Sequence, residues 1–195
     1  MRKLTGTICI LLGLVCLFCS VGFVVYNHIE AENAAKASES LLEDVQGLIG
    51  EQKIEQNNSQ TKMPTIKVGG YDCIGVLSVP VLDLELPVLT DWSYKKLKKA
   101  PCLYYGTYYD KDFVIAAHNY KAHFGRLSEL EAGDIVVFTD AVGDKHCYEV
   151  VLLETLPSNA TKEMIASGFD LSLYTCTTGG GSRVTVRCNL SQGSC

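Results

Sequence analysis

The N-terminal segment is the feature that most constrains this chain. Residues Thr5–Tyr26 form a run of 22 residues without a charged side chain. In a helix that rises about 1.5 Å per residue, such a run spans a hydrocarbon core of roughly 30 Å. Arg2 and Lys3 precede the run, and Glu30 and Glu32 follow it. Because basic flanks stay in the cytoplasm, we expect the rest of the chain to be extracytoplasmic.

A cleaved signal peptide is the alternative interpretation of this segment. The apolar part of a signal peptide is usually only ~7–15 residues long, which is shorter than this run. Phe18, which precedes Cys19, is also too bulky for the small residue that a lipoprotein cleavage site requires. The sequence therefore favours an uncleaved single-pass anchor in the cell membrane, with residues 1–27 as cytoplasmic tip and transmembrane helix.

The next segment, residues 28–62, predicts a helical stalk and linker among alanines and glutamates that favour helix. An apolar stripe recurs there at the spacing of one helical face: Leu41, Leu42, Val45, Leu48 and Ile49. The stripe could pair with another chain, or the segment could be a spacer that lies on the membrane or on the following domain. The polar run 55–60 predicts the end of the helix.

Residues 63–195 predict one all-β domain. Seven short runs rich in Val, Ile, Leu and aromatic residues are separated by Gly, Pro and Asp. We expect strands at Tyr71–Val79, Glu85–Leu89, Asp112–Ala117, Asp134–Thr139, Cys147–Thr155, Leu171–Thr177 and Arg183–Leu190. Two short helices are expected, at Tyr94–Lys99 and Ala160–Ala166. Short strands between turns favour a barrel or sandwich over βαβ units, and the segment is long enough for one core.

Charge and cysteine content exclude several classes of protein. A net charge of −5 and an isoelectric point of 5.4 give no electrostatic footprint for nucleic acid. Three of the nine cysteines lie in the apolar N-terminus, and the other six contain no CxxC pair, which argues against a zinc ribbon or a thioredoxin-type site. Cys102 or Cys147 could pair with Cys73 or Cys188, but sequence alone does not set the connectivity.

Two predicted strand ends carry side chains that can do chemistry. His118 stands at the end of one apolar strand, where the pattern turns polar. Cys176 ends another strand, shortly before Thr178 and three glycines. A thiol at a strand end before a glycine-rich turn is accessible to a substrate, whereas a thiol within the strand would be sealed in the core. His123 is the rival histidine, but only His118 directly ends the apolar strand.

A cysteine nucleophile needs help from other groups. A thiol whose pKa is near 8.5 is little ionised at neutral pH, so a histidine usually carries the protons. Donors must also stabilise the oxyanion of the tetrahedral intermediate. Arg183 follows Cys176 by seven residues, and a hairpin would return its guanidinium to the sulfur. Arg187 shares its strand face and is a possible substitute. Each residue taken singly is more often structural than catalytic.

Several separated motifs resemble one family. The segment Ser172–Cys176 (SLYTC) resembles the TLxTC signature of sortases, with Ser in place of the first Thr. Arg183, on its Val-rich strand, resembles the catalytic arginine of that family. The region Ile115–Asp134 contains a strand, His118, a loop with an F-x-x-L element and a Gly-Asp turn, and it resembles the catalytic-histidine region. The likeness extends in order from about Tyr71 to Leu190.

The resemblance implies a closed β-barrel of about eight strands with short helices and a Cys-His-Arg site. Sortases are extracytoplasmic cysteine transpeptidases of mostly Gram-positive bacteria. They cleave an LPxTG-like sorting signal near the C-terminus of surface proteins or pilins, hold the acyl group as a thioester, and pass it to an amine of a cell-wall precursor or a pilin. The resemblance assigns Cys176 as nucleophile, His118 as general acid/base and Arg183 as stabiliser of the oxyanion.

The resemblance leaves the sortase class open. The connection Leu156–Phe169 looks shorter than the helical insert of class B enzymes, and no lid-like extension typical of pilin polymerases is evident before Tyr71. Glu129 and Glu131 lie in a loop that could bind calcium, but scattered surface carboxylates are the commoner explanation. We therefore expect no required metal and no other cofactor.

Two other functions remain open at this point. One is a non-catalytic, membrane-anchored β-domain that binds surface proteins or peptides at a degenerate site. The other is a cysteine hydrolase that shares the site and passes the acyl group to water.

Overall fold

A computed structural model of the chain describes residues 2–50, 63–191 and 193. Helix α1 (Arg2–Leu48) runs without interruption through the expected anchor and much of the expected stalk. From Gly6 onwards it is long and apolar enough to cross a membrane. The polar run 55–60, where we expected the helix to end, lies outside the described residues. The chain divides into two compact units, residues 1–33 and 34–195, so the last part of α1 belongs with the β-domain.

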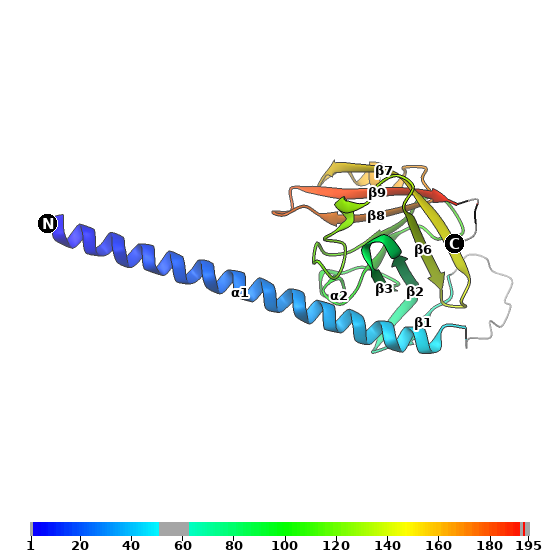
Figure 1. Cartoon of the computed structure of the whole chain (residues 1–195), viewed down its shortest axis with the longest axis horizontal. Helices are drawn as coiled ribbons and strands as arrows, with labels where there is room; N and C mark the ends of the chain where they lie inside the picture. The colour runs from blue at the N-terminus through cyan, green and yellow to red at the C-terminus, as the bar shows by residue number, and fades with distance from the viewer. Residues whose placement is uncertain (1, 51–62, 192, 194–195) are drawn as a thin grey trace. The chain divides into compact units, whose positions relative to one another are not determined.

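Nine strands form within the described residues (Figure 1). They are β1 (Ile66–Val68), β2 (Tyr71–Val79), β3 (Leu84–Leu89), β4 (Cys102–Tyr105), β5 (Phe113–Ala116), β6 (Ile135–Asp140), β7 (Lys145–Pro157), β8 (Leu171–Cys176) and β9 (Ser182–Leu190). Their order is β1-β2-β3-β4-β5-β8-β9-β7-β6, and β2 also pairs with β6. Strands β2 to β9 therefore close into an eight-stranded barrel, and β1 adds to it as an extra strand. The expected barrel is confirmed.

All seven predicted strands are present within a few residues of their expected ends, and β1 and β4 are additional. β1 has only three residues and β4 only four, so neither gives a strong alternating pattern in the sequence. The two predicted helices form as α2 (Tyr94–Leu97) and α3 (Thr161–Ile165), and two short 3₁₀ turns occur at Pro80–Leu82 and Leu127–Glu129. Ser93 caps α2, because its side chain accepts a hydrogen bond from the backbone N–H of Lys96 at 3.2 Å.

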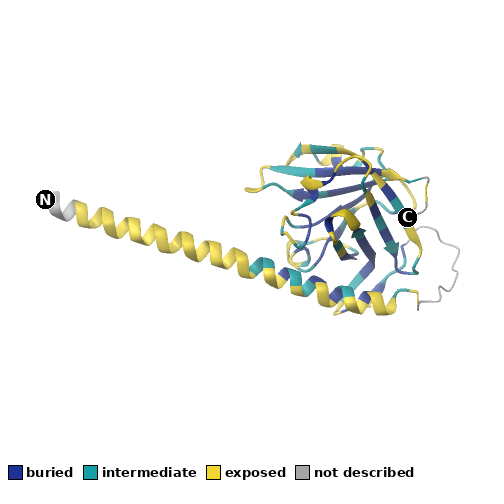
Figure 2. Ribbon diagram, viewed as in Figure 1, coloured by how far each residue is buried: buried dark blue, intermediate teal, exposed yellow. Residues whose placement is uncertain are grey.

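The barrel interior holds the larger of two apolar clusters, and Figure 2 shows its strands lined with buried residues. The second cluster lies where α1 meets the β-domain. There Leu41 and Val45 pack with Ile66, Val68 and other buried residues, and Val45 is completely buried. Burying an aliphatic side chain of this size contributes about 1.5–3 kcal/mol. Of the alternatives for the apolar stripe, the structure has it packed on the following domain.

Closure of the barrel depends on close backbone approach at Gly75. This residue lies at a bulge in β2 and pairs with Asp140 of β6. Its φ is 152°, and a Cβ atom added here would lie 2.1 Å from the carbonyl oxygen of Thr139. Only glycine lets the two strands approach this closely.

The cysteines of the domain do not pair as the sequence suggested. Cys73, Cys102 and Cys188 are buried free thiols, so neither Cys73 nor Cys188 forms a disulfide with Cys102 or Cys147. Cys147 is disulfide-bonded. Burial raises the pKa of each of the three buried thiols to about 12, which keeps them protonated at any physiological pH.

Candidate active site

Three neighbouring strands carry His118, Cys176 and Arg183. β5 and β8 run parallel, with Ala116 opposite Tyr174. His118 and Cys176 each follow these partners by two residues, so both lie at the carboxyl end of their strand, on the same rim of the barrel. β8 and β9 form an antiparallel hairpin in which Cys176 and Arg183 are direct partners. The expected hairpin is therefore present.

The three side chains line one pocket. One wall is aromatic: the rings of Trp92 and Tyr104 lie 5.7 Å apart, and those of Tyr104 and Tyr174 lie 5.2 Å apart. Another part of the lining comes from the end of β7, the β7–β8 connection and α3: Pro157, Ser158, Ala160, Thr161 and Met164. The site is thus a groove with largely apolar walls and a thiol, an imidazole and a guanidinium at its lining.

Cys176 differs from the other described cysteines of the β-domain. Its side chain is half-buried and faces the pocket, whereas Cys73, Cys102 and Cys188 are sealed in the core. A cysteine acts as a nucleophile only if its sulfur can ionise and a substrate can reach it. Cys147 is disulfide-bonded, so Cys176 is the one described cysteine of this domain that meets both conditions.

The two histidines of the His118 loop have different surroundings. The ring of Tyr120 packs between them, at 4.9 Å from the ring of His118 and 5.7 Å from that of His123. His118 lines the pocket, whereas His123 is completely buried and does not. Burial, and secondarily the proximity of His118, lowers the pKa of His123 to about 4. His123 is therefore a neutral core residue at physiological pH.

Thr175 ties together the two strand ends that carry His118 and Cys176, a contact that the sequence did not predict. Its hydroxyl is buried and donates a hydrogen bond of 2.9 Å to the carbonyl of Ala117, the residue before His118. The N–H of Ala117 in turn donates to the carbonyl of Tyr174 at 3.2 Å. The residues preceding His118 and Cys176 are thus joined by two bonds. A polar residue on the buried face of an apolar strand was the only available signal.

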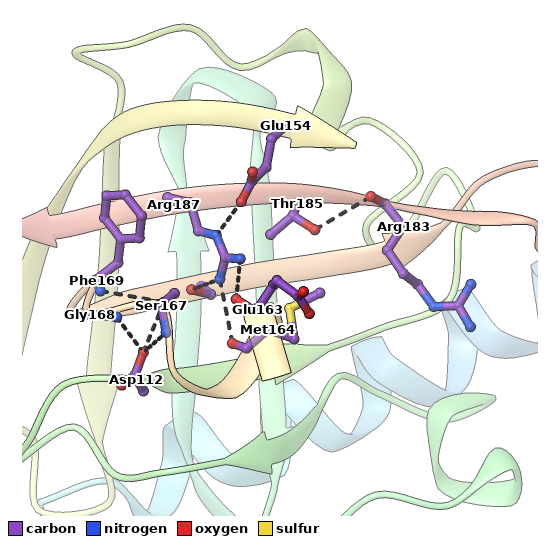
Figure 3. Close-up of polar contacts among 11 residues, drawn as sticks. Asp112, Glu154, Glu163, Met164, Ser167, Gly168, Phe169, Arg183, Thr185 and Arg187 are labelled. Carbon is purple, nitrogen blue, oxygen red and sulfur yellow. Dashed lines mark hydrogen bonds and ion pairs between the residues drawn. The ribbon is translucent and has the colours of Figure 1, made fainter. Parts of the chain in front are cut away.

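The two arginines of β9 differ in surroundings as well. Arg183 lines the pocket, and its Nη1 donates to the carbonyls of Gly180 and Ser182, both at 3.0 Å. Arg187 is buried and does not line the pocket, and its donors engage other groups. Figure 3 shows the two guanidinium groups separated along the strand. Arg183, and not its possible substitute Arg187, is beside Cys176.

Cys176 also lines a second pocket. Its lining holds no charged side chain: Asn119, Phe124, Gly125, Ser128, Thr175, Cys176, Thr177, Thr178 and Val184. Cys176 is shared by this pocket and the aromatic groove. A group attached to the sulfur can therefore be approached from a hydroxyl-lined side as well as from an apolar side.

Within the described residues, no group of three or more His, Cys, Asp or Glu side chains is arranged to hold a metal ion. The carboxylate of Glu129, in the loop considered for calcium, accepts hydrogen bonds of 2.8 to 3.1 Å from the guanidinium of Arg126. Glu129 is therefore paired with Arg126 in this structure.

Comparison with solved structures supports the fold. A sortase D5 transpeptidase from Clostridium perfringens aligns with a TM-score of 0.64 and 16% identity, over 80% of this chain and 99% of that one. Sortase C1 from Streptococcus agalactiae aligns with a TM-score of 0.59 and 18% identity, over 80% of this chain and 88% of that one. Sortase C1 from Streptococcus suis aligns with a TM-score of 0.53 and 24% identity, over 63% of this chain and 74% of that one. Because the sequence identities are this low, these alignments show a shared fold alone.

The sequence itself carries the family assignment. Among curated proteins, no sequence matches this one. The family model described as the Sortase domain matches residues 77–191, which include the end of β2, all of β3 to β9 and the strand ends described above. A match over more than half of the chain, together with the barrel and its rim, leads to one conclusion: the chain belongs to the sortase family.

Proposed function

We propose that this chain is a membrane-anchored cysteine transpeptidase that cleaves an LPxTG-like C-terminal sorting signal and transfers the protein to an amine of a cell-wall precursor or a pilin. Its β-domain would act outside the cell membrane, held by residues 1–27. The observation that carries the proposal is the convergence of Cys176, His118 and Arg183 on one pocket from three adjacent strands.

The first step forms the acyl-enzyme. The thiolate of Cys176 attacks the carbonyl carbon of the scissile peptide bond, and a C–S bond forms. The guanidinium of Arg183 retains donors beyond those bound to Gly180 and Ser182, and these stabilise the developing oxyanion. His118 then protonates the leaving amine as the C–N bond breaks, which leaves a thioester on the sulfur.

The second step transfers the acyl group. An acceptor amine attacks the thioester carbon, His118 accepts the proton of the amine, and the C–S bond breaks to regenerate the thiolate beside protonated His118. Aminolysis of the thioester is the reverse of amide cleavage. The acceptor therefore enters from the side on which the leaving amine departed. With the acyl chain in the aromatic groove, that side is the hydroxyl-lined pocket shared by Cys176.

The walls of the groove suit the residues that precede the scissile bond in such a signal. Apolar side chains and a proline ring bury their surface well against Trp92, Tyr104 and Tyr174, at roughly 25 cal/mol per Å² of apolar area. The aromatic wall does not favour a charged segment, because a charge would lose its hydration against these rings without a hydrogen-bonding partner.

The test uses the full chain in detergent micelles with a fluorescent LPxTG-type peptide, with and without added amines. We expect Cys176→Ala to lose turnover by about a thousandfold or more, while the matched control Cys188→Ala, at a buried core thiol, stays active. Mass spectrometry should find the acyl group on Cys176 in the wild type. Cleavage retained in Cys176→Ala with an unchanged thermal unfolding curve would remove the assignment.

The product distribution separates the remaining functions. A transpeptidase gives ligated product when amines are added, whereas a hydrolase gives the free carboxylate at every amine concentration. A non-catalytic binding domain gives neither product, and a thiol probe such as a methanethiosulfonate then labels Cys176 no faster than it labels a free thiol such as glutathione. Replacing Arg183 with Ala should lower kcat by about a hundredfold, since it removes an oxyanion donor.

A further inference from the structure

The other arginine of β9 occupies an unusual position. The side chain of Arg187 is only 1% exposed, yet it carries a permanent charge. Its Nε donates to a carboxylate oxygen of Glu154 at 2.7 Å, and its Nη1 donates to the hydroxyl of Ser172 at 2.8 Å. The ring of Phe169 lies 5.7 Å from the guanidinium carbon. Burying a cation is costly unless it is paired and hydrogen-bonded, so this position requires its partners.

The remaining donors of Arg187 reach the C-terminal end of helix α3 (Figure 3). Nη2 donates to the carbonyl of Glu163 at 2.8 Å, and Nη1 makes a longer contact of 3.5 Å with the carbonyl of Met164. The last carbonyls of a helix have no partner within it, and a basic side chain can satisfy them. Arg187 thus fastens α3 to strands β8 and β9 through the backbone of the helix.

Helix α3 has little else to fix its position. It has five residues, far below the length at which a helix is stable by itself, and Met164 is its one buried residue. The connection is also fixed after the helix, where a carboxylate oxygen of Asp112 accepts three bonds of 2.7 to 2.8 Å from Ser167 and Gly168. Between β7 and that clamp, Arg187 supplies the polar attachment of α3.

The same short helix forms one wall of the groove beside Cys176. Ala160, Thr161 and Met164 line that groove together with the aromatic residues. A small displacement of α3 would therefore change the width of the groove without touching the thiol, the imidazole or Arg183.

We propose that Arg187 is a positioning residue, which holds α3 in place as a preformed wall of the peptide groove and so sets the affinity for the residues that precede the scissile bond. The proposal rests on the proposed function, because it concerns how that groove binds a peptide. Arginine suits the position because its planar fork reaches Glu154, Ser172 and the two carbonyls at once, whereas a lysine ammonium lacks that fixed geometry.

The experiment compares wild type, Arg187→Met, Arg187→Lys and Ser172→Ala, all as the full chain in detergent micelles. Val136→Ala is the control for general destabilisation, since Val136 is buried in the barrel core and does not line the groove. Three quantities are measured: hydrogen exchange of the backbone amides of residues 158–166, KM and kcat for the sorting-signal peptide, and the rate at which a small methanethiosulfonate forms a mixed disulfide with Cys176.

In Arg187→Met we expect amide exchange over 158–166 to rise about tenfold or more relative to β2. We also expect KM to rise about tenfold, with kcat at saturating peptide and the rate of mixed-disulfide formation at Cys176 changed by less than about threefold. Arg187→Lys and Ser172→Ala should show the same changes to a smaller extent. These two variants decide the question if Arg187→Met does not unfold cooperatively.

Two results would overturn the proposal. The first is wild-type exchange over 158–166 in all three variants. The second is an equal rise of KM in Val136→Ala at the same loss of thermal stability, which would make the effect a general one. If the wild type itself cleaves no peptide, the proposed function fails, but the exchange measurement still decides whether Arg187 holds α3.

Discussion

Acidification from pH 6.5 to pH 4 should destabilise the β-domain through one side chain, His123. In the folded protein this histidine is completely buried, and its pKa is lowered to about 4, first by burial and then by the nearby His118; a backbone interaction with Ala34 opposes these effects. In the unfolded chain a histidine has a pKa of about 6.5. Between these two values the unfolded state binds a proton that the folded state does not, so stability falls as the pH falls.

The size of the effect follows from the difference between the two pKa values. At 1.36 kcal/mol per pH unit, the interval from 6.5 to about 4 corresponds to a loss of about 3 kcal/mol. The loss of stability caused by His123 is close to zero above pH 6.5 and is complete near pH 4. Because a domain is typically stable by only about 5–15 kcal/mol, this one group would remove a large share of the total.

The assay is denaturant unfolding of the full chain in detergent at pH values from 7.5 to 4, for wild type and for His123→Leu. Carboxylates also titrate in this range, but they do so in both proteins, so the difference in slope between the two curves isolates His123. The leucine variant should have a different stability at pH 7.5 and a shallower decline below 6.5. Parallel curves for the two proteins would refute the reasoning.

Two further substitutions test contacts that hold the rim and the barrel. Thr175→Val leaves the carbonyl of Ala117 without its hydroxyl donor, so it should lower the free energy of unfolding by about 1–3 kcal/mol and also lower turnover. Thr175→Ser keeps the hydroxyl and should retain turnover. Equal stability and turnover in the Val and Ser variants would contradict this. Gly75→Ala places a Cβ against the carbonyl of Thr139 and should cost more than about 3 kcal/mol, whereas Gly70→Ala, with φ 80° and open space, should cost only about 1 kcal/mol; similar melting temperatures would contradict this.

The sequence was informative wherever a pattern is local. Each predicted strand is a continuous apolar run between turn residues, and such runs depend only on neighbours in the chain. The pairing of Cys176 with Arg183 was accessible for the same reason, because a glycine turn joins their two strands directly. Preference for His118 over His123 also came from a local observation, namely which histidine ends the apolar strand.

Contacts between distant segments could not be predicted in this way. The bond from Thr175 to Ala117 crosses 58 residues of sequence, and that from Arg187 to Glu154 crosses 33. Arg187 lies on the same face of the strand as Arg183 and carries the same charge. No local sequence feature therefore distinguishes a buried structural arginine from one in a pocket. Packing of Val45 against the β-domain likewise depends on tertiary structure.

The parallel pairing of β5 with β8 has a consequence for how the protein could vary. The strand ends that carry His118 and Cys176 are aligned by a hydrogen-bonded ladder, while 54 residues of chain separate those strands in sequence. Hairpins and turns in that intervening stretch can lengthen or shorten without changing the spacing between sulfur and imidazole. Grafting a foreign loop between β6 and β7 is accordingly a route to new partners that leaves the reaction centre in register.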